Sequence, residues 1–445
     1  MIKFTSLSLD IQKRLSLKEI EELAKATKFV QRRSPITGFV FFYICIRSVM
    51  NNGLSSLTES CAIGLEKGVI VSKSSLHERF NIKAVSFMRK LFDRIMSIKL
   101  EEQLVLKVKA LDKFTSLYLQ DATLHRLPNN LSSLYKGSGG GRKGKASKGG
   151  LKTDLSYNLF GSEMNIKFRN GASSDSNIEI RKIVKGGLYL FDLGYFNLKR
   201  FSALIKGEAF FISRYKFKTQ IFETQEGEQA IGVLDYIKEL KEQEILDKMI
   251  YLGKTRRLPV RLVIQRVPDE IFKEKKEKLE EQVKNKGKNV SEQRLEFCAV
   301  SAYITNLSME EFCSTQIISF YSIRWQVEIL FKAWKSILNF RLVHPMNEHR
   351  FMCLLYGQMI FITLNMKVFQ AIKIYTWNKY KIEVSELKGY KILKQLNSIL
   401  TQAIKHNDKK GFLEFIEKAA KAILLFGEKE YRKNRKSTIF SAFSP

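Results

Sequence analysis

Cysteine and histidine are scarce in this chain, and their spacing argues against two kinds of site. The 445 residues include 5 cysteines, without a Cys-x-x-Cys pair and without a histidine at zinc-finger distance. Neither a disulfide framework nor a structural zinc site is therefore expected, and a reducing compartment fits best. The 5 histidines show no metal-binding spacing either.

A leader segment and long apolar runs are also missing. The N-terminus has no charged region that leads into an apolar one, so we expect no signal peptide. The longest apolar stretches, 39–46 and 351–364, are too short or too interrupted to cross a bilayer, which takes about 20 apolar residues. We expect both to be buried helices of a cytoplasmic protein.

Acidic residues are few relative to basic ones. The chain has 76 Lys and Arg against 45 Asp and Glu, which gives a net charge of +31 and a pI near 9.8. Such a surface concentrates polyanions, of which nucleic acid is the commonest in a cell. Frequent Lys, Ile and Asn with only 6 Pro could equally reflect an AT-rich genome. A content of 44% apolar and 27% charged residues excludes a disordered or fibrous chain and fits one to three globular domains.

The N-terminal part has a helical pattern, with apolar positions three and four residues apart from about 17 to 98. Within it, 56–65 and 72–80 have the proportions of a helix-turn-helix, in which the second helix enters the major groove of DNA. Ser72 is expected to cap that second helix. Two helices joined by a glycine-containing turn are also common in plain bundles. The residues that would contact DNA are Lys73, Ser75 and Arg79.

After about residue 108 the pattern changes to short strands that alternate with helices, which predicts an α/β (α+β) fold. The expected strands are 117–120, 155–160, 164–168, 188–191, 249–252, 260–266 and 297–305. The region 215–319 differs in its pattern of strands and charged residues from the segments around it, which indicates an inserted subdomain. Its charged stretch 272–290 is expected to be a solvated helix or a hairpin tip.

A glycine-rich basic loop, 137–150, separates the first two strands. Gly139, Gly144 and Lys145 have the spacing of a phosphate-binding P-loop. Ala146 stands where such a loop needs Ser or Thr, so we reject a nucleotide site. The loop either lies against a phosphodiester backbone or is a plain connector. The residues that would contact DNA are Arg142, Lys143, Lys145 and Lys148.

Two aspartates share an unusual context, since Asp121 follows the apolar sequence LYLQ and Asp192 follows LYLF. A buried carboxylate persists when it is paired with a cation or binds a metal. Two of them on neighbouring strands would repel unless a divalent ion lay between them. Either aspartate alone is more typical of an ordinary turn or cap.

The stretch 320–340 has no Gly or Pro and is predicted as one amphipathic helix. At about 100° per residue, its polar side chains form a stripe about 80° wide. The stripe comprises Tyr321, Arg324, Glu328, Lys332 and Lys335. The opposite face, which is expected to pack, comprises Ile323, Val327, Leu330, Trp334 and Ile337. An ordinary surface helix with a Glu328–Lys332 pair is the plain alternative.

The spacing Tyr321-x2-Arg324-x3-Glu328-x6-Lys335 resembles the Tyr-Arg-Glu-Lys signature of the insertion sequence 4 family of DDE transposases. Asp121 and Asp192 stand where the first two acids of that family stand. The resemblance covers roughly 17–374 and implies a ribonuclease-H-like core with a β-rich insertion, preceded by a helical DNA-binding domain. The implied domains are 1–108 (helical, DNA-binding), 109–214 (core, first part), 215–319 (insertion) and 320–445 (core, second part, and helical C-terminal region).

The resemblance also implies a metal site. Asp121, Asp192 and Glu328 would bind two Mg²⁺ ions, or Mn²⁺ in their place, because hard cations prefer oxygen ligands. Two such ions activate the attacking oxygen and stabilise the leaving oxygen in phosphodiester chemistry. The implied reaction is cleavage of DNA at the transposon ends, followed by attack of the freed 3′-hydroxyl on target DNA.

The resemblance assigns DNA contacts as well. Tyr321 and Arg324 would hold a phosphate of the transposon end, while Lys332 and Lys335 neutralise nearby backbone charge. The partners would be the inverted repeats at the transposon ends and target DNA, bound by a homodimer in the nucleoid of a prokaryote. The alternatives are a metal-dependent nuclease without strand transfer and a non-catalytic DNA-binding regulator or decayed transposase.

One feature departs from the family. Some relatives hold a flipped base against a tryptophan of the insertion, whereas the tryptophans here lie outside 215–319. They are Trp325, Trp334 and Trp377. Stacking by the insertion would then need Tyr251, Phe297 or Tyr303, and a hairpinned DNA intermediate is left open.

Overall fold

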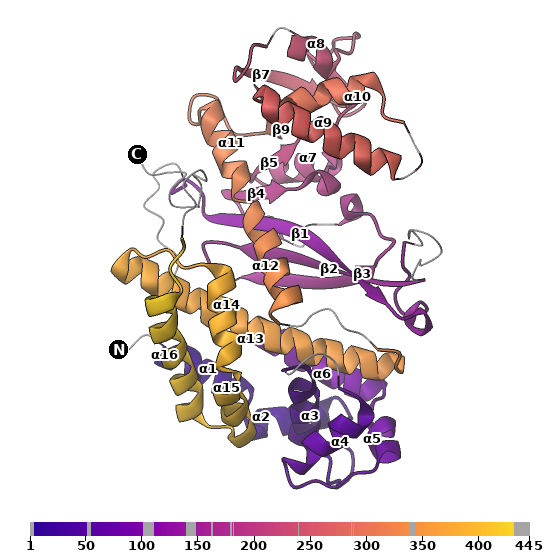
Figure 1. Ribbon diagram of the computed structural model, residues 1–445, viewed down its shortest axis with the longest axis vertical. Coiled ribbons are helices and arrows are strands. Elements are labelled where there is room, and N and C mark those ends of the chain that lie inside the picture. The colour runs from indigo at the N-terminus through magenta and orange to yellow at the C-terminus, as the bar shows by residue number, and fades with distance from the viewer. Residues whose placement is uncertain are drawn as a thin grey trace. The chain divides into compact units, whose positions relative to one another are not determined.

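The computed structural model describes residues 4–50, 55–100, 111–138 and 148–430, apart from 162, 179, 181, 239, 286, 288 and 339–343. Contacts within the chain divide it into two compact units (Figure 1). Unit 1 holds the described residues of Met1–Val105, Ala122–Ser173 and Val327–Arg435, and unit 2 those of Leu106–Asp121 and Ser174–Gln326. Both units are discontinuous in sequence. The four domains drawn from the sequence stay a prediction.

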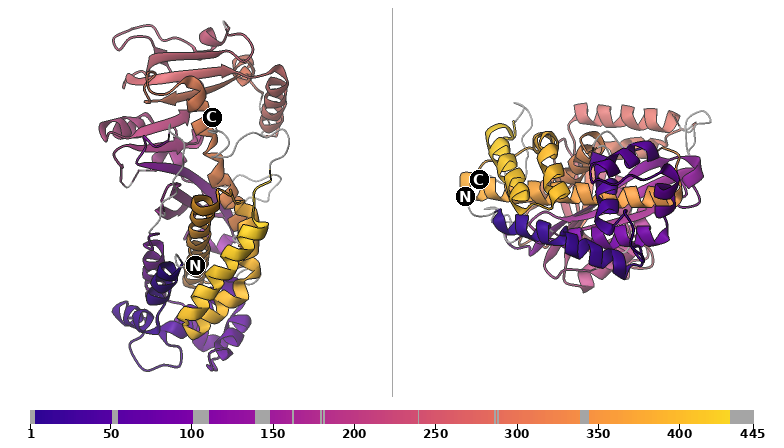
Figure 2. Two further views of the ribbon diagram at one scale, coloured as in Figure 1. Left: turned by 90° about the vertical axis from the view of Figure 1, so that its left-hand side faces the viewer. Right: turned by 90° about the horizontal axis from the view of Figure 1, so that it is seen from below.

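Helices make up most of unit 1. The N-terminal ones are α1 (Thr5–Arg14), α2 (Leu17–Ala26), α3 (Gly38–Met50), α4 (Leu57–Leu65), α5 (Lys73–Arg79) and α6 (Ile82–Met96). The C-terminal ones are α13 (Glu348–Tyr380), α14 (Glu386–Gln395), α15 (Asn397–His406) and α16 (Lys409–Phe426). Figure 2 shows α14, α15 and α16 gathered together, and the expected helical N-terminal region is confirmed.

The long helix α13 is the core of unit 1. It is long and apolar enough to span a membrane, but 94% of its apolar window is buried inside the protein. It packs against α3 and α6, and Gly357 permits the close approach of α3, because a Cβ there would lie 3.0 Å from the carbonyl oxygen of Cys45. Both apolar stretches predicted as buried helices are therefore confirmed.

The helix-turn-helix proportions predicted from the sequence are also present. Ser56 and Glu59 form a capping box at the start of α4, and the side chain of Ser72 caps α5 by accepting from the backbone N–H of Ser75. Gly68 takes a positive φ of 70° in the turn between the helices, which a residue with a side chain rarely adopts. Leu76 is buried and anchors α5 to the rest of the unit.

The strands of unit 1 follow the order β3-β2-β1, where β3 is Met164–Asn170 and β2 is Gly149–Asn158. The strand β1, Ser116–Leu127, passes from unit 2 into unit 1 after Asp121. The strands β2 and β3 are antiparallel, and Arg169 on β3 pairs with the buried Asp154 on β2. The helix α12, Trp325–Ser336, has its first two residues in unit 2 and the rest in unit 1.

The strands of unit 2 follow the order β1-β4-β5-β9-β8-β7-β6. Their bounds are β4 (Gly187–Phe191), β5 (Phe210–Arg214), β6 (Ile221–Phe222), β7 (Ile245–Leu252), β8 (Leu258–Arg266) and β9 (Val300–Thr305). The strands β1, β4 and β5 are parallel, whereas the others pair antiparallel. The helices are α7 (Leu198–Lys206), α8 (Val233–Lys238), α9 (Asp269–Lys284), α10 (Glu292–Glu296) and α11 (Ser314–Ser322).

The predicted strands are found, with shifted ends. The strand predicted at 117–120 continues to Leu127, and the one predicted at 297–305 begins only at Val300 after a short 3₁₀ turn. The charged stretch 272–290 contains most of α9, whose described residues are all at least partly exposed, so the solvated helix is confirmed. A mixed sheet with helices confirms the α/β class.

Candidate active site

Three neighbouring parallel strands of unit 2 present charged side chains at the same level. The strands β1 and β4, and then β4 and β5, run in register up to the residue before each charged position. Those positions are Asp121, Asp192 and Arg214. Residues level with each other on adjacent strands lie about 4.8 Å apart and point to the same face. The fold therefore sets these two acidic positions and one basic position next to one another at the same end of the three parallel strands.

The setting of Asp121 corrects one expectation. The sequence predicted that its strand ends at this residue, whereas β1 continues for six more residues, to Leu127. The reason is that β1 pairs with β4 only as far as Gln120, while its later half belongs with β2 in the strand order of unit 1. Asp121 thus lies where β1 leaves its partner β4. Asp192 directly follows the last residue of β4, as predicted, and its main-chain carbonyl accepts from Tyr195 N–H at 2.9 Å.

The helix predicted over 320–340 is in fact two helices, so this prediction is wrong. The helix α11 ends at Ser322 and α12 begins at Trp325, and the link is a tight turn in which Arg324 N–H donates to Tyr321 C=O at 3.1 Å. The apolar face was predicted correctly. Its members are all buried, namely Ile323, Val327, Leu330, Trp334 and Ile337.

The break also changes the polar stripe, because Tyr321 and Arg324 are buried rather than solvated. Tyr321 is 5% exposed, and its ring lies 4.9 Å from that of Tyr303 on β9. The guanidinium groups of Arg214 and Arg324 lie 5.8 and 5.7 Å from the Tyr321 ring centre. The tyrosine is thus enclosed between a second aromatic ring and two cations.

Tyr321 is a neutral donor at physiological pH. Burial raises the pKa of its phenol to about 12, the nearby arginines oppose this shift, and Asp192 adds to it. Its buried hydroxyl has no hydrogen-bond partner among the residues that the structure describes. A buried hydroxyl without a partner is costly, so the site favours an acceptor from outside the chain.

Arg324 links the tight turn to the acidic pair. One of its terminal nitrogens lies 4.0 Å from a carboxylate oxygen of Asp121, and both side chains are largely shielded from water. Arg214 was missed by sequence reasoning. The signal that singled out the aspartates, a charge directly after the apolar run FFIS, would have found it.

The remaining residues of the predicted signature belong to unit 1. Glu328 lies in the first turn of α12, where the helix dipole favours a negative charge, and it is partly exposed. Lys332 is exposed and Lys335 is partly exposed on the same helix.

The side chains of the site show whether a metal ion would fit there. Among the described residues, no group of three or more acidic, His or Cys side chains is arranged to hold a metal ion. Asp121 and Asp192 nevertheless follow paired residues of β1 and β4, and their carboxylate oxygens are the donors that Mg²⁺ and Mn²⁺ prefer. Two like charges that lie close together repel unless a cation compensates them. The donor set therefore fits a divalent hard cation.

Comparison with known proteins decides the family, since residues 112–366, more than half of the chain, match the profile described as a transposase DDE domain. The chain belongs to the DDE transposase family. It is 30% identical over 469 residues to the transposase for insertion sequence element IS1151 of Clostridium perfringens, across 99% of this chain and 96% of that protein. It is 29% identical over 420 residues to the transposase for IS231C of Bacillus thuringiensis subsp. berliner, across 90% and 87%.

Membership of the family confirms the fold class and the enzyme class. A DDE domain has a ribonuclease-H-like core, and the parallel strands β1, β4 and β5 carry the acidic pair in this transposase. The enzyme is a DDE transposase, and enzymes of this family generally use divalent metals.

Two of the three side chains predicted on the helix-turn-helix are available to a ligand. Lys73 and Ser75 are exposed on α5 of the transposase. Arg79 is not, because its guanidinium lies 4.5 Å from the ring centre of Phe29 and donates to the carbonyl of Ile36 at 2.9 Å. The guanidinium of Arg79 is thus engaged within unit 1, and a DNA contact for this residue stays a prediction.

The glycine-rich loop is anchored at its base. Gly137 N–H donates to Lys148 C=O at 2.7 Å, and Lys148 N–H donates to the side chain of Asn129 at 3.0 Å. The side chain of Lys148 is exposed. The other three predicted contacts, Arg142, Lys143 and Lys145, lie outside the described residues.

Several aromatic side chains of unit 2 could be considered for stacking with a base. Tyr303 is buried against Tyr321, whereas Phe297 is partly exposed, and its ring centre lies 4.9 Å from that of Phe217. Tyr251 is also partly exposed. Sequence reasoning passed over Trp325, which directly follows Arg324 and is 59% exposed. An exposed indole next to a buried arginine is the signal that could have found it.

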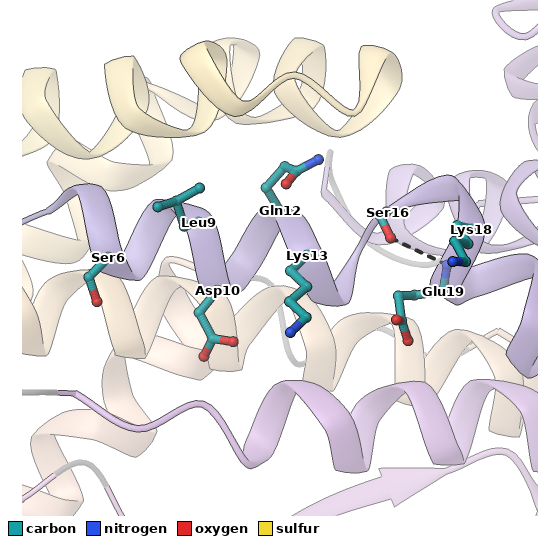
Figure 3. A pocket seen from close by; sticks show the side chains of 8 residues that line it. All are labelled: Ser6, Leu9, Asp10, Gln12, Lys13, Ser16, Lys18 and Glu19. Atoms are coloured by element: carbon teal, nitrogen blue, oxygen red, sulfur yellow. Dashed lines mark hydrogen bonds between the residues drawn. The ribbon is translucent and has the colours of Figure 1, made fainter.

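A hollow of about 680 Å³ lies at the junction of α1 and α2 in unit 1 (Figure 3). Its lining residues are Ser6, Leu9, Asp10, Gln12, Lys13, Ser16, Lys18 and Glu19. Acids and lysines both line it, and Ser16 accepts from the N–H of Glu19 at 3.3 Å. A lining of mixed charge does not select a polyanion, and none of the predicted site residues belongs to it.

Proposed function

We propose that this transposase cleaves DNA at the ends of its own insertion sequence and joins the freed 3′-hydroxyl ends to target DNA. The observation that carries the proposal is the pair of Asp121 and Asp192, set at one level on two parallel strands. The printed names of the relatives, transposases for insertion sequence elements, support this substrate.

We assign Asp121, Asp192 and Glu328 as the carboxylates that hold two Mg²⁺ ions, with Mn²⁺ as a substitute. When bound, the ions would activate the attacking oxygen and stabilise the leaving oxygen of the phosphodiester. Glu328 stands in the first turn of α12, where the helix dipole favours its negative charge.

A phosphate of the transposon end is the acceptor that the enclosed tyrosine lacks. The Tyr321 hydroxyl would donate to a phosphate oxygen while the nearby Arg214 and Arg324 supply positive charge. Arginine suits this role because its planar fork can bind a phosphate through two N–H groups. Lys332 and Lys335 would neutralise the backbone further along the strand.

Recognition of the ends is assigned to unit 1. Lys73 and Ser75 on the exposed face of α5 would reach a groove of the DNA. The basic loop would follow the backbone through Arg142, Lys143, Lys145 and Lys148, since phosphate contacts dominate affinity. Two ends must be held together before strand transfer, so we propose a homodimer on DNA, located with the nucleoid.

A cleavage assay with labelled end DNA and Mg²⁺ tests the proposal. The variants Asp192→Asn and Glu328→Gln should lose cleavage by at least about 100-fold while still binding DNA, because each removes a metal ligand without removing a DNA contact. The matched controls are Asp112→Asn and Glu310→Gln, both exposed positions of unit 2, and they should cleave normally.

The same assay separates the alternatives. Cleavage without joined products indicates a nuclease, and binding without any cleavage by the wild type indicates a regulator or a decayed copy. Binding is measured at several salt concentrations, since each phosphate contact contributes about −0.9 to the log–log slope. Full cleavage by Asp192→Asn would refute the site assignment.

A further inference from the structure

Arg200 is a buried arginine of unit 2 that follows Asp192 by eight residues in the sequence. It is the third residue of α7, and Asn197 caps this helix by accepting from the N–H groups of Lys199 and Arg200 at 2.9 and 3.2 Å. Only 7% of Arg200 is exposed. Burial lowers the pKa of its guanidinium to about 10, while Tyr195 and Asp175 oppose the shift.

The hydrogen-bond acceptors of Arg200 are backbone carbonyls from two separate segments. One terminal nitrogen donates to the carbonyl of Tyr195, in the short 3₁₀ turn Leu193–Tyr195. The other donates to the carbonyls of Asp175 at 3.3 Å, Ser176 at 3.2 Å and Ile178. A single side chain therefore joins the segment before β4 to the segment after it.

Both segments constrain the backbone at Asp192. This residue begins the 3₁₀ turn, and its carbonyl accepts from the N–H of Tyr195 at 2.9 Å. The guanidinium of Arg200 lies 5.4 Å from the ring centre of Phe191, the residue before the acid, and 5.6 Å from that of Tyr195. Asn197 adds a second tie by donating to the carbonyl of Ser176 at 2.8 Å. The backbone around Asp192 is thus fixed from both sides.

We propose that Arg200 is a positioning residue that holds the Asp192 carboxylate at the level of Asp121. The proposal rests on the assignment of Asp192 as a metal ligand. A carboxylate must stay within about 0.5 Å of its working position to serve a metal site. The Arg200 side chain supplies that constraint through groups that touch neither metal nor DNA.

Arginine is required here because of the number and geometry of its donors. Its guanidinium presents five N–H groups in a fixed plane, whereas a lysine has three donors on one rotatable nitrogen. The variant Arg200→Lys keeps the charge but cannot serve carbonyls on both segments. The turn that carries Asp192 would then be free to shift.

A second buried arginine of unit 2 supplies the matched control. Arg261 is 1% exposed and donates to Ser308 C=O and Phe312 C=O at 2.9 and 2.7 Å. It also pairs with Asp247 at 2.5 Å. It joins two segments as Arg200 does, but neither of them adjoins Asp121 or Asp192 in the chain. Arg261→Lys should therefore lower the stability of the fold, as Arg200→Lys is expected to do, without disturbing the turn at Asp192.

Manganese binding to the full-length transposase tests the proposal apart from activity. Free Mn²⁺ is measured by electron paramagnetic resonance during titration, and thermal unfolding is followed in parallel. Arg200→Lys should weaken Mn²⁺ binding about tenfold and raise the Mg²⁺ concentration for half-maximal cleavage by a similar factor. Arg261→Lys should lower the unfolding temperature yet bind Mn²⁺ as the wild type does.

Unchanged metal dependence in folded Arg200→Lys would overturn the proposal and make the residue merely structural. Should that variant fail to fold, Asn197→Asp tests the same junction, because it keeps the capping oxygen and loses the donor to Ser176. It should weaken Mn²⁺ binding about threefold, and wild-type binding would again overturn the proposal. Asp192→Asn is run alongside: if it binds Mn²⁺ normally and still cleaves, the site assignment itself has failed.

Discussion

The Tyr321 hydroxyl is a neutral donor near two guanidinium groups, so its removal should cost one hydrogen bond to the bound phosphate. A hydrogen bond to a charged group contributes about 2 kcal/mol, or about thirtyfold in rate. Tyr321→Phe should therefore slow cleavage of end DNA about thirtyfold. Because burial raises the pKa of Tyr321 to about 12, the phenol stays protonated at pH 7 and at pH 9, so the defect should be equal at both.

The neighbouring tyrosine supplies the control for this prediction. Tyr303→Phe keeps the ring that contacts Tyr321 and should slow cleavage much less. Rates are compared under single-turnover conditions with saturating DNA, so that binding does not contribute. An unchanged rate in Tyr321→Phe would show that its hydroxyl does not act on the scissile phosphate or its neighbours.

Individual residues were predictable from the sequence where local context is distinctive. Asp121 and Asp192 stand out because an apolar run leads directly into a charge, and the register of β1 with β4 sets them at one level. The surroundings of Arg79 could not be predicted, because nothing local shows that its guanidinium lies over the ring of Phe29 and donates to the carbonyl of Ile36. Contacts distant in sequence therefore determine where the Arg79 side chain lies.

At the level of elements, a lysine with an altered pKa ties α9 to the sheet of unit 2. Lys275 donates to the carbonyl of Val300 at 3.0 Å and to the hydroxyl of Ser301 at 3.1 Å. Burial lowers its pKa from the ordinary 10.5 to about 8, and nearby Arg214 adds to this shift. Between these values the unfolded chain binds a proton that the folded chain has released.

Stability should therefore rise with pH between about 8 and 10.5 on account of Lys275. Urea unfolding at pH 7.5 and pH 9.5 checks this by comparing the wild type with Lys275→Met. The wild type should gain stability relative to the variant at the higher pH. Parallel behaviour of the two proteins would contradict the lowered pKa.

The break between α11 and α12 shows the limit of sequence reasoning for elements. Periodicity predicted the buried face correctly, because Val327 and Trp334 repeat at helical spacing. It could not predict the turn at Arg324, since the sequence there has neither Gly nor Pro. The turn brings the guanidinium of Arg324 to within 4.0 Å of Asp121, so tertiary contacts outweighed local helix propensity.

For the whole molecule, the family and the α/β class followed from the sequence, but the division into two units did not. Each unit collects segments from distant parts of the chain, and the boundary cuts β1 after Asp121 and α12 before Val327. Residue spacing carries no information about such boundaries. As a result, two of the proposed metal ligands belong to unit 2 and the third, Glu328, belongs to unit 1.

The central claim is that these three carboxylates share divalent cations when DNA is bound. Anomalous scattering from Mn²⁺ in crystals of the transposase with transposon-end DNA measures this directly. We predict peaks about 2.1 Å from carboxylate oxygens of Asp121 and Asp192, with Glu328 completing the same site. Ions bound elsewhere, or a Glu328 carboxylate directed away from the bound ions in that complex, would contradict the claim.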